Sequence, residues 1–169
     1  MAKQQVSENL SSKQLHTLKI IFKFRVVTSS LLATYRGVNK DSLNRMLQNL
    51  VDQKYIRKQY NNSYRIDRKG ARYSLASKGI TYLAKNTDLS KKALHAMYNQ
   101  KSESFINHCL ATFQLANYIK QAYPEEFYIY SSTEIAGDGD FPLPRPHLYL
   151  RRQEPIDTKP DEFFIEVNH

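Results

Sequence analysis

The sequence predicts an α+β fold, because its hydrophobic periodicity changes twice along the chain. Residues 12–52 carry apolar side chains at helical spacing, whereas residues 55–75 alternate between apolar and polar side chains as strands do. A second helical stripe over 102–122 precedes three short strand-like runs. These runs are 127–130, 147–150 and 163–167. We therefore expect helices and a ribbon first, then a long helix packed on a small mixed β-sheet.

The composition of the 169-residue chain excludes several classes of protein. Hydrophobic residues make up 41% and charged residues 24%, which favours a folded core over disorder. No apolar run could span a bilayer, and the first residues lack the apolar segment of a secretory signal. Cys109 is the one cysteine, so an intramolecular disulfide and a cysteine-based zinc module are both excluded. The sequence predicts a cytoplasmic protein without membrane association.

The search for cofactor and metal motifs gives no candidate. There is no glycine-rich phosphate loop, and the five histidines do not have the spacing of zinc ligands. Cys109 follows His108, and adjacent residues on a helix do not share a face, so packing is the favoured role for this thiol. We expect no cofactor and no metal.

The charges are distributed unevenly between the two halves of the chain. Residues 1–101 hold 20 basic and 5 acidic side chains, whereas residues 102–169 hold 5 basic and 11 acidic side chains. The net charge is +9. A surplus of cations favours a polyanionic partner, because binding to phosphates releases counterions. The acidity of the second half argues against its lying on DNA.

Composition and periodicity divide the chain into four segments. They are a polar tail at 1–9, a basic domain at 10–87, a lysine-rich connector at 88–101 and an α/β domain at 102–169. In the basic domain, a first helix follows the serine pair at 11–12, and residues 26–29 read as a connection. A second, shorter helix is expected, with Ser29 or Ser30 as its N-cap and Gly37 at its end.

The third predicted helix has the most regular apolar stripe of the chain. The stripe consists of Leu43, Met46, Leu47, Leu50 and Val51. Asn39 or Asp41 is its expected N-cap. The opposite face presents Asn44, Arg45 and Gln48, whose amide and guanidinium groups match the edges of bases in the major groove. The same polarity is typical of a face that is merely solvated.

A ribbon of two strands, at 55–60 and 72–75, follows these helices, with the turn at 61–63 and residues 64–67 continuing the ribbon. Three helices followed by a ribbon is the order of a winged helix-turn-helix, which places its last helix in the major groove. The ribbon is rich in cations that suit phosphates, namely Arg57, Lys58, Arg65, Arg68, Lys69 and Arg72. Arg36 and Lys40, near the start of the third helix, are further candidates for phosphate contact. Winged helices that bind protein instead of DNA are the alternative.

Several short segments resemble the replication-relaxation family, in which a winged helix precedes an α/β region. The resemblance covers most of residues 10–168 and is carried by short motifs. They are the run 10–18, the run 26–32, the strand-and-glycine step at 73–79, His108, Arg145-Pro146-His147 and the run 163–167, where the family has Arg-Pro-Asp and Phe-Phe-Leu-Glu-Val-Asp.

The second region of that family is in turn similar to restriction-endonuclease-like folds, which need an acidic residue on one strand and Glu-x-Lys on the next to hold Mg²⁺ and activate water. This chain departs from the pattern, because His147 stands in place of the metal-binding aspartate and Asn168 in place of the lysine. Glu134 and Glu166 are the remaining candidates for catalysis. The resemblance therefore implies a degenerate, non-catalytic version, with a divergent metal-dependent nuclease as the alternative.

Together these observations predict a protein that binds double-stranded DNA without catalysis. The resemblance implies an accessory or regulatory role in the replication or mobilisation of a plasmid or other mobile element. In this hypothesis the second half forms a homodimer or recruits a replication or mobilisation protein. A winged-helix transcriptional repressor is the other alternative.

Overall fold

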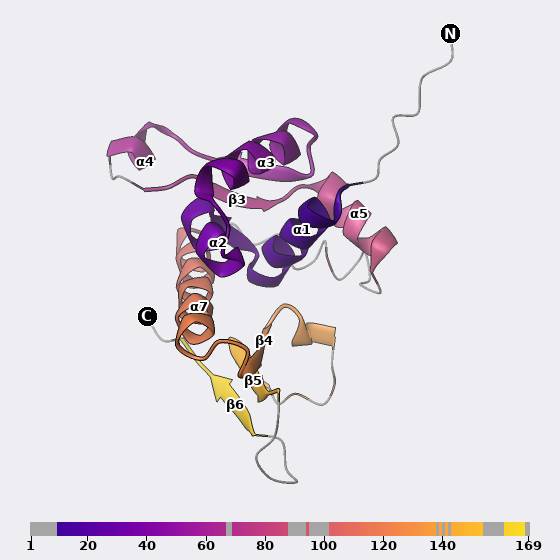
Figure 1. Ribbon diagram of the computed structural model, residues 1–169, viewed down its shortest axis with the longest axis vertical. Helices are drawn as coiled ribbons and strands as arrows, with labels where there is room; N and C mark the ends of the chain where they lie inside the picture. The colour runs from indigo at the N-terminus through magenta and orange to yellow at the C-terminus, as the bar shows by residue number, and fades with distance from the viewer. Residues whose placement is uncertain are drawn as a thin grey trace.

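The computed structural model describes residues 10–66, 69–87, 94, 102–137, 139, 141, 143–153 and 161–167 of the chain. The first part contains α1 (Ser12–Phe24), β1 (Val26–Thr28), α2 (Ser29–Arg36), α3 (Lys40–Asp52), β2 (Ile56–Gln59), α4 (Asn62–Ile66), β3 (Arg72–Leu75) and α5 (Ser77–Asn86). The second part contains α7 (Glu103–Ala122), β4 (Phe127–Ser131), the 3-10 turn η1 (Ile135–Gly137), β5 (Leu148–Arg152) and β6 (Glu162–Ile165). Figure 1 shows these elements in chain order.

The helices α1, α2 and α3 each begin at a polar N-cap residue, and α2 ends at a glycine. Ser11 caps α1 in a capping box, in which its side chain and that of Gln14 each accept a backbone N–H. Gly37 ends α2 in the left-handed conformation at φ +62°, and Asn39 caps α3, as expected. The cap of α2 is Thr28 rather than Ser29 or Ser30. These caps satisfy backbone groups that the helix ends leave unpaired.

The prediction of a connection at residues 26–29 is wrong, because residues 26–28 form the strand β1. β1 pairs antiparallel with β3, and β3 pairs antiparallel with β2, so the strand order is β1-β3-β2. Val27 is fully buried in this sheet, opposite Tyr73. The β-branched residues of β1 suit a pleated, buried surface. Helices α1 to α3 on this three-stranded sheet form the winged helix-turn-helix expected from the sequence.

The tip of the ribbon also differs from the prediction, because residues 62–66 form the short helix α4 and do not continue the strand. The Asn61 side chain accepts the Tyr64 N–H at 3.1 Å and the Ser63 hydroxyl at 2.7 Å, which favours a helical turn at this point. Tyr64 is thereby turned inward and is 6% exposed. Figure 1 shows α4 at the end of an arm that projects from the rest of the winged helix.

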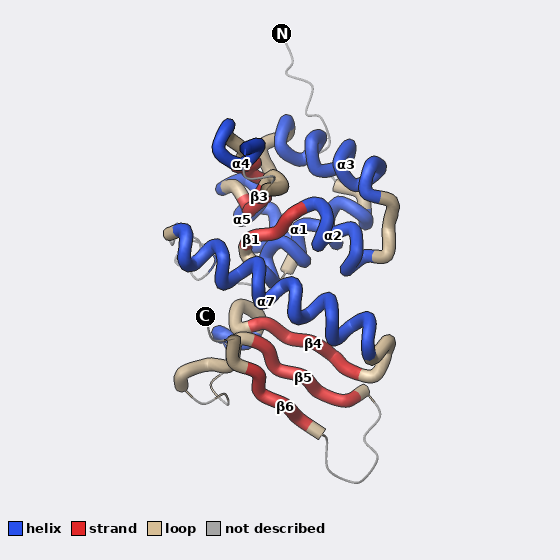
Figure 2. Tube along the Cα trace, turned by 90° about the vertical axis from the view of Figure 1, so that its left-hand side faces the viewer, coloured by secondary structure: helices blue, strands red, loops and turns tan. Residues whose placement is uncertain are grey.

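The second sheet is a meander of β4, β5 and β6, and both pairs of strands are antiparallel, so the expectation of a mixed sheet is wrong. Alternate side chains point toward α7, and among them Ile129, Leu148 and Leu150 are buried. These strand residues belong to the same apolar cluster as Phe113 of α7 and Leu18 of α1. Figure 2 shows α7 running between the winged helix and the sheet. The two predicted domains are therefore joined by one continuous core.

An aromatic cluster forms the contact between α7 and the winged helix. Phe113 stacks on Phe24 with ring centroids 4.3 Å apart, and Tyr35 lies 5.4 Å from both rings. Aromatic pairs of this kind stabilise a core beyond the area that they bury. Among the described residues, no helix is long and apolar enough to cross a membrane.

Gly79 in the first turn of α5 is the position where the packing tolerates no side chain. A Cβ there would overlap the carbonyl oxygen of Tyr55. We expect Gly79→Ala to lower the free energy of unfolding by about 1–3 kcal/mol, because the backbone of one of the two segments must move. Urea unfolding followed by circular dichroism measures the effect. Gly139→Ala is the matched control, since a Cβ there meets nothing within 4 Å, and an equal loss in both variants would contradict the proposed overlap.

Candidate nucleic-acid interface

The exposed side of α3 carries the polar residues that the sequence predicts for base contact. Leu43, Leu47 and Leu50 are buried, so the helix turns the opposite side outward. Arg45 and Gln48 are exposed there and Asn44 is half-buried. This places amide and guanidinium groups on a helix that is attached to the fold only by its other side.

The ribbon beside α3 presents a second set of polar and cationic side chains. Arg57 and Lys58 of β2 are exposed, as are Arg65 of α4 and Lys69 after it. Tyr60, at the end of β2, is 50% exposed and lies edge-on to Tyr64 at 6.4 Å. The cations therefore follow the outer side of the projecting arm.

One hydrogen bond joins the helix and the ribbon into a continuous surface. The Lys58 ammonium group donates to the Gln48 side-chain oxygen at 3.4 Å. The Gln48 amide nitrogen donates in turn to Asp52 at 2.8 Å. Gln48 is therefore held in a defined orientation at the junction. We call the surface formed by Lys40, Asn44, Arg45, Gln48, Arg57, Lys58, Arg65 and Lys69 the helix–wing surface.

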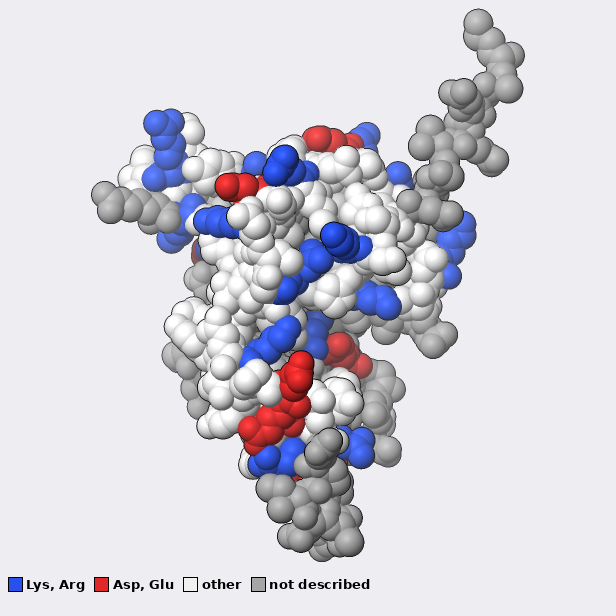
Figure 3. Space-filling view, viewed as in Figure 1, with Lys and Arg blue, Asp and Glu red and all other residues white. Residues whose placement is uncertain are grey.

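Positive charge is not confined to the helix–wing surface. Figure 3 shows Lys and Arg side chains spread over the upper part of this face of the molecule, while the largest group of acidic side chains lies lower down. Exposed cations such as Lys19 of α1 and Lys85 of α5 belong to elements outside the helix–wing surface. The charge alone therefore does not identify one binding face. The shape of the projecting wing is the feature that identifies it.

Arg36 was expected to be exposed and to contact phosphate, but its side chain points into the winged helix. It is half-buried and donates to the Thr17 hydroxyl at 2.7 Å and to the Met46 sulfur at 3.8 Å. Burial lowers the pKa of its guanidinium group. The side chain thus links α2 to α1 and α3 inside the winged helix, and we remove it from the DNA-contact candidates.

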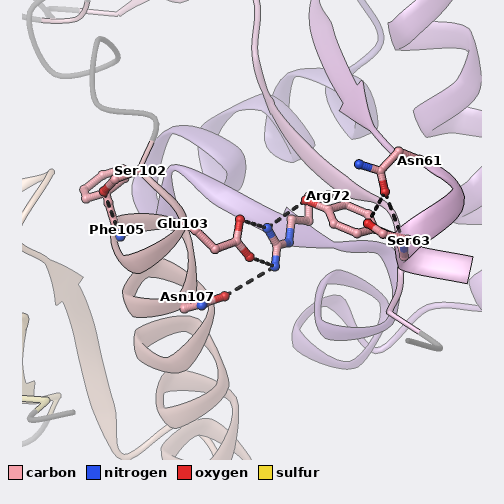
Figure 4. A network of polar contacts seen from close by, with 8 residues as sticks. Asn61, Ser63, Arg72, Ser102, Glu103, Phe105 and Asn107 are labelled. Atoms are coloured by element: carbon pink, nitrogen blue, oxygen red, sulfur yellow. Dashed lines mark hydrogen bonds and ion pairs between the residues drawn. The ribbon is translucent and has the colours of Figure 1, made fainter. Parts of the chain in front are cut away.

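The prediction that Arg72 contacts a phosphate backbone is also wrong, because this residue is only 4% exposed. Its guanidinium group donates two hydrogen bonds to the Glu103 carboxylate, at 2.8 and 2.7 Å, and a further one to Asn107 at 3.3 Å. It also donates to the Tyr64 hydroxyl at 2.8 Å and lies over that ring. Figure 4 shows this network between the wing and the start of α7. A count of charges along the sequence cannot reveal this network, because it treats every arginine as a surface group.

The Arg72 network connects the tip of the wing to the second half of the chain. Tyr64 belongs to α4, Arg72 to β3, and Glu103 to the first turn of α7, where a carboxylate also suits the helix dipole. A bidentate arginine–carboxylate pair has a strict geometry. The base of the wing is therefore held against α7, while its outer cations stay exposed.

Two of the residues considered for a nuclease site, Glu134 and His147, are engaged in structural contacts. Glu134 forms an ion pair with Lys23 at 3.1 Å and accepts the Ser131 N–H. His147 accepts the Val167 N–H at 2.7 Å. Glu166 is exposed after β6. In the described part of the chain, no group of three or more His, Cys, Asp or Glu side chains could hold a metal ion.

Cys109 is buried beside Val26 and Ile106, and burial raises the pKa of its thiol to about 11, which agrees with a packing role. Arg68 and Asn168 lie outside the described residues.

The fold and the exposed helix and wing define a winged helix-turn-helix protein with an appended α/β unit. The sequence matches the replication-relaxation family over residues 18–168, and the chain belongs to that family. A search of curated protein sequences gave no match.

A comparison with solved structures gives partial matches. A mutant of MarR from E. coli complexed with operator DNA is 20% identical, with a TM-score of 0.43 over 69% of this chain and 77% of that chain. A mutant of ZitR from Lactococcus lactis is 15% identical, with a TM-score of 0.41 over 73% of this chain and 82% of that chain.

The Arg72–Glu103 pair predicts a stability that depends on pH. Hydrogen bonds from Arg72 lower the pKa of Glu103 below its ordinary value of 4.5. The pair is therefore fully formed above that ordinary value, and its contribution is lost as the pH falls through the lowered pKa. We expect Glu103→Gln to lower the thermal unfolding temperature at neutral pH, and the difference from the unchanged protein to shrink in acid. The exposed Glu125→Gln is the control, and a constant difference at every pH would contradict the pair.

Proposed function

We propose that this protein binds double-stranded DNA through the helix–wing surface, without catalysis. It would act as an accessory or regulatory factor in the replication or mobilisation of a plasmid or other mobile element. The observation that carries the proposal is the junction of α3 with the wing. Through the Lys58–Gln48 hydrogen bond, a polar helix and a cationic arm form one exposed surface.

The two parts of this surface suit two different parts of a duplex. An α-helix fits the major groove, which is about 12 Å wide, and the amide and guanidinium groups of α3 can reach base edges there. The outer side of the wing carries Arg57, Arg65 and Lys69, which suit the neighbouring phosphates. The Arg45 guanidinium group is exposed and makes no hydrogen bond or ion pair with the residues that the structure describes, so its donors are available to a base.

The role in replication or mobilisation is supported by membership of the replication-relaxation family. A homodimer and a partner protein of the replication machinery are further parts of the proposal. If two copies bind together, DNA selected from a random pool should contain an inverted repeat with a half-site spacing set by the dimer. Selected DNA that contains only one copy of the recognition sequence would contradict the proposed dimer.

Removing two wing cations should weaken binding to all duplexes alike. We expect Arg57→Ala with Arg65→Ala to flatten the plot of log affinity against log salt by about two units, since each lost phosphate contact accounts for about 0.9. Fluorescence anisotropy with a labelled duplex at several salt concentrations measures the slope. Lys19→Ala with Lys85→Ala is the matched control, because it removes the same charge from α1 and α5. If the control flattens the slope equally, attraction is diffuse and the helix–wing assignment is wrong.

Removing a group from α3 should instead change which sequence is preferred. Arg45→Ala should cost about 1–3 kcal/mol on the selected site if the guanidinium contacts a base, and much less on duplexes that differ at that base pair. Competition between the selected site and its single-base variants measures this difference. A uniform loss on every duplex would mean that Arg45 contacts only phosphate.

A further inference from the structure

The tip of the wing carries one exposed apolar side chain among its cations. Ile66, the last residue of α4, is 80% exposed, which is the largest exposed fraction among the large hydrophobic residues of the described chain. Arg65 before it and Lys69 after it are exposed as well. A single exposed isoleucine is ordinary on a protein surface, so its place in the structure decides whether it has a use. Figure 1 shows α4 at the far end of the projecting arm.

The short helix that carries Ile66 is held from behind. Tyr64, on the inner side of α4, is 6% exposed, and its hydroxyl accepts a hydrogen bond from Arg72 at 2.8 Å. Arg72 is itself bound to Glu103 of α7 by two hydrogen bonds. After the tip, the Lys69 N–H donates to the Tyr64 carbonyl oxygen at 2.8 Å. Ile66 therefore projects from a support that is tied to the body of the protein.

Phosphate contact explains the cations of the wing but not this isoleucine. Arginine and lysine bind phosphates, whereas an aliphatic side chain gains nothing against a charged backbone. Proteins that bind the minor groove combine both kinds of side chain: arginine or lysine lies along the groove, and an apolar side chain such as isoleucine is inserted between two base pairs. Such a wedge must be held from behind, because otherwise the chain that carries it yields instead of the DNA. The anchored tip, with Arg65 and Lys69 on either side of Ile66 in the sequence, meets these requirements.

The position of the wing beside α3 suits contact with a minor groove. In the duplex-binding proposal, on which the following step rests, α3 enters the major groove. The arm of β2 and β3 extends from beside α3 to α4 (Figure 1). An arm that leaves a major groove crosses one phosphate backbone, where Arg57 and Arg65 would lie, and its tip then reaches the adjacent minor groove.

We propose that Ile66 is inserted between two base pairs from the minor groove, so that the protein kinks the duplex to which it binds. Wedges of this kind bend DNA by about 20–90° toward the major groove. Insertion costs least at pyrimidine–purine steps such as TA and CA, because these steps are the easiest to unstack. The wing therefore favours such a step at a fixed distance from the bases that α3 contacts. This bending is an activity additional to binding, and it requires no base-specific hydrogen bond from the wing.

Energy transfer between dyes at the two ends of a selected duplex of about 30 base pairs measures the bend produced by the full chain. Binding of the unchanged protein should bring the two ends closer together. Ile66→Ala should lose most of this change and keep the salt slope of binding, because it removes no charge. Ile66→Leu, which conserves the side-chain volume, should keep most of the bend. Leu143→Ala is the matched control, since Leu143 is 77% exposed and lies in the second half of the chain, and it should bend DNA as the unchanged protein does.

A series of duplexes, each with one mismatched base pair at a successive step beside the site of α3, locates and tests the insertion. A mismatch at the wing step removes part of the stacking in advance, so the unchanged protein should bind that duplex roughly ten- to a hundredfold more tightly than the intact one. Ile66→Ala should bind both duplexes within about twofold, since it has no wedge to insert.

The outcomes distinguish the wedge from the duplex binding on which it depends. If the unchanged protein binds without drawing the duplex ends together, or if Ile66→Ala bends DNA equally, the wedge is overturned and duplex binding stands. If Leu143→Ala loses as much of the bend as Ile66→Ala, the effect is not specific to the wing and the wedge is again overturned. If Ile66→Ala changes the sedimentation mass of the free protein, Ile66 serves a contact between copies and the wedge fails. If no duplex is bound at all, the helix–wing proposal fails and the wedge fails with it.

Discussion

The structure depends on one helix, α7, that packs against both the winged helix and the second sheet. Phe113 of α7 is fully buried and stacks on Phe24 of the winged helix, while the same apolar cluster continues into Leu148 and Leu150 of the second sheet. Neither half buries this surface alone. Since burial of apolar area is the main favourable term in folding, α7 makes the winged helix and the sheet one cooperative unit. The orientation of α3 and the wing is therefore tied to the packing of the second half.

Much of this fold could be predicted from periodicity and caps. The stripe of α3, the Gly37 stop and the long helix α7 are strong local signals, and the structure has all three. The strand β1 and the short helix α4 could not be predicted, for different reasons. β1 has three residues and gains its identity only by pairing with β3. α4 depends on side-chain hydrogen bonds from Asn61, which compete with the strand pattern that the neighbouring residues suggest.

The candidate site shows the same division between local and long-range information. Residues whose exposure follows from a helical stripe, such as Arg45 and Gln48, lie where the sequence places them. Arg36 and Arg72 do not, because each is drawn inward by partners that are distant in sequence: Thr17 for Arg36 and Glu103 for Arg72. Nothing in a local window identifies such partners. The contacts among Tyr130, Tyr149 and Phe164 could not be predicted either, since these residues become neighbours only through the register of three strands.

The two borders of the β4–β5–β6 sheet are protected by different means. At β4, the Lys23 ammonium group donates to the Ile129 carbonyl oxygen and so occupies an acceptor that another strand would need. At β6, the described residues provide no further strand, and Phe163 and Phe164 are 45% and 54% exposed. Glu162 and Glu166 flank this pair of phenylalanines with negative charge. If two copies paired through their β6 edge strands, these carboxylates would come close together. Electrostatic repulsion therefore opposes self-association of β6 into fibrils. High salt would screen this repulsion and low pH would neutralise the carboxylates, so either condition would remove the protection.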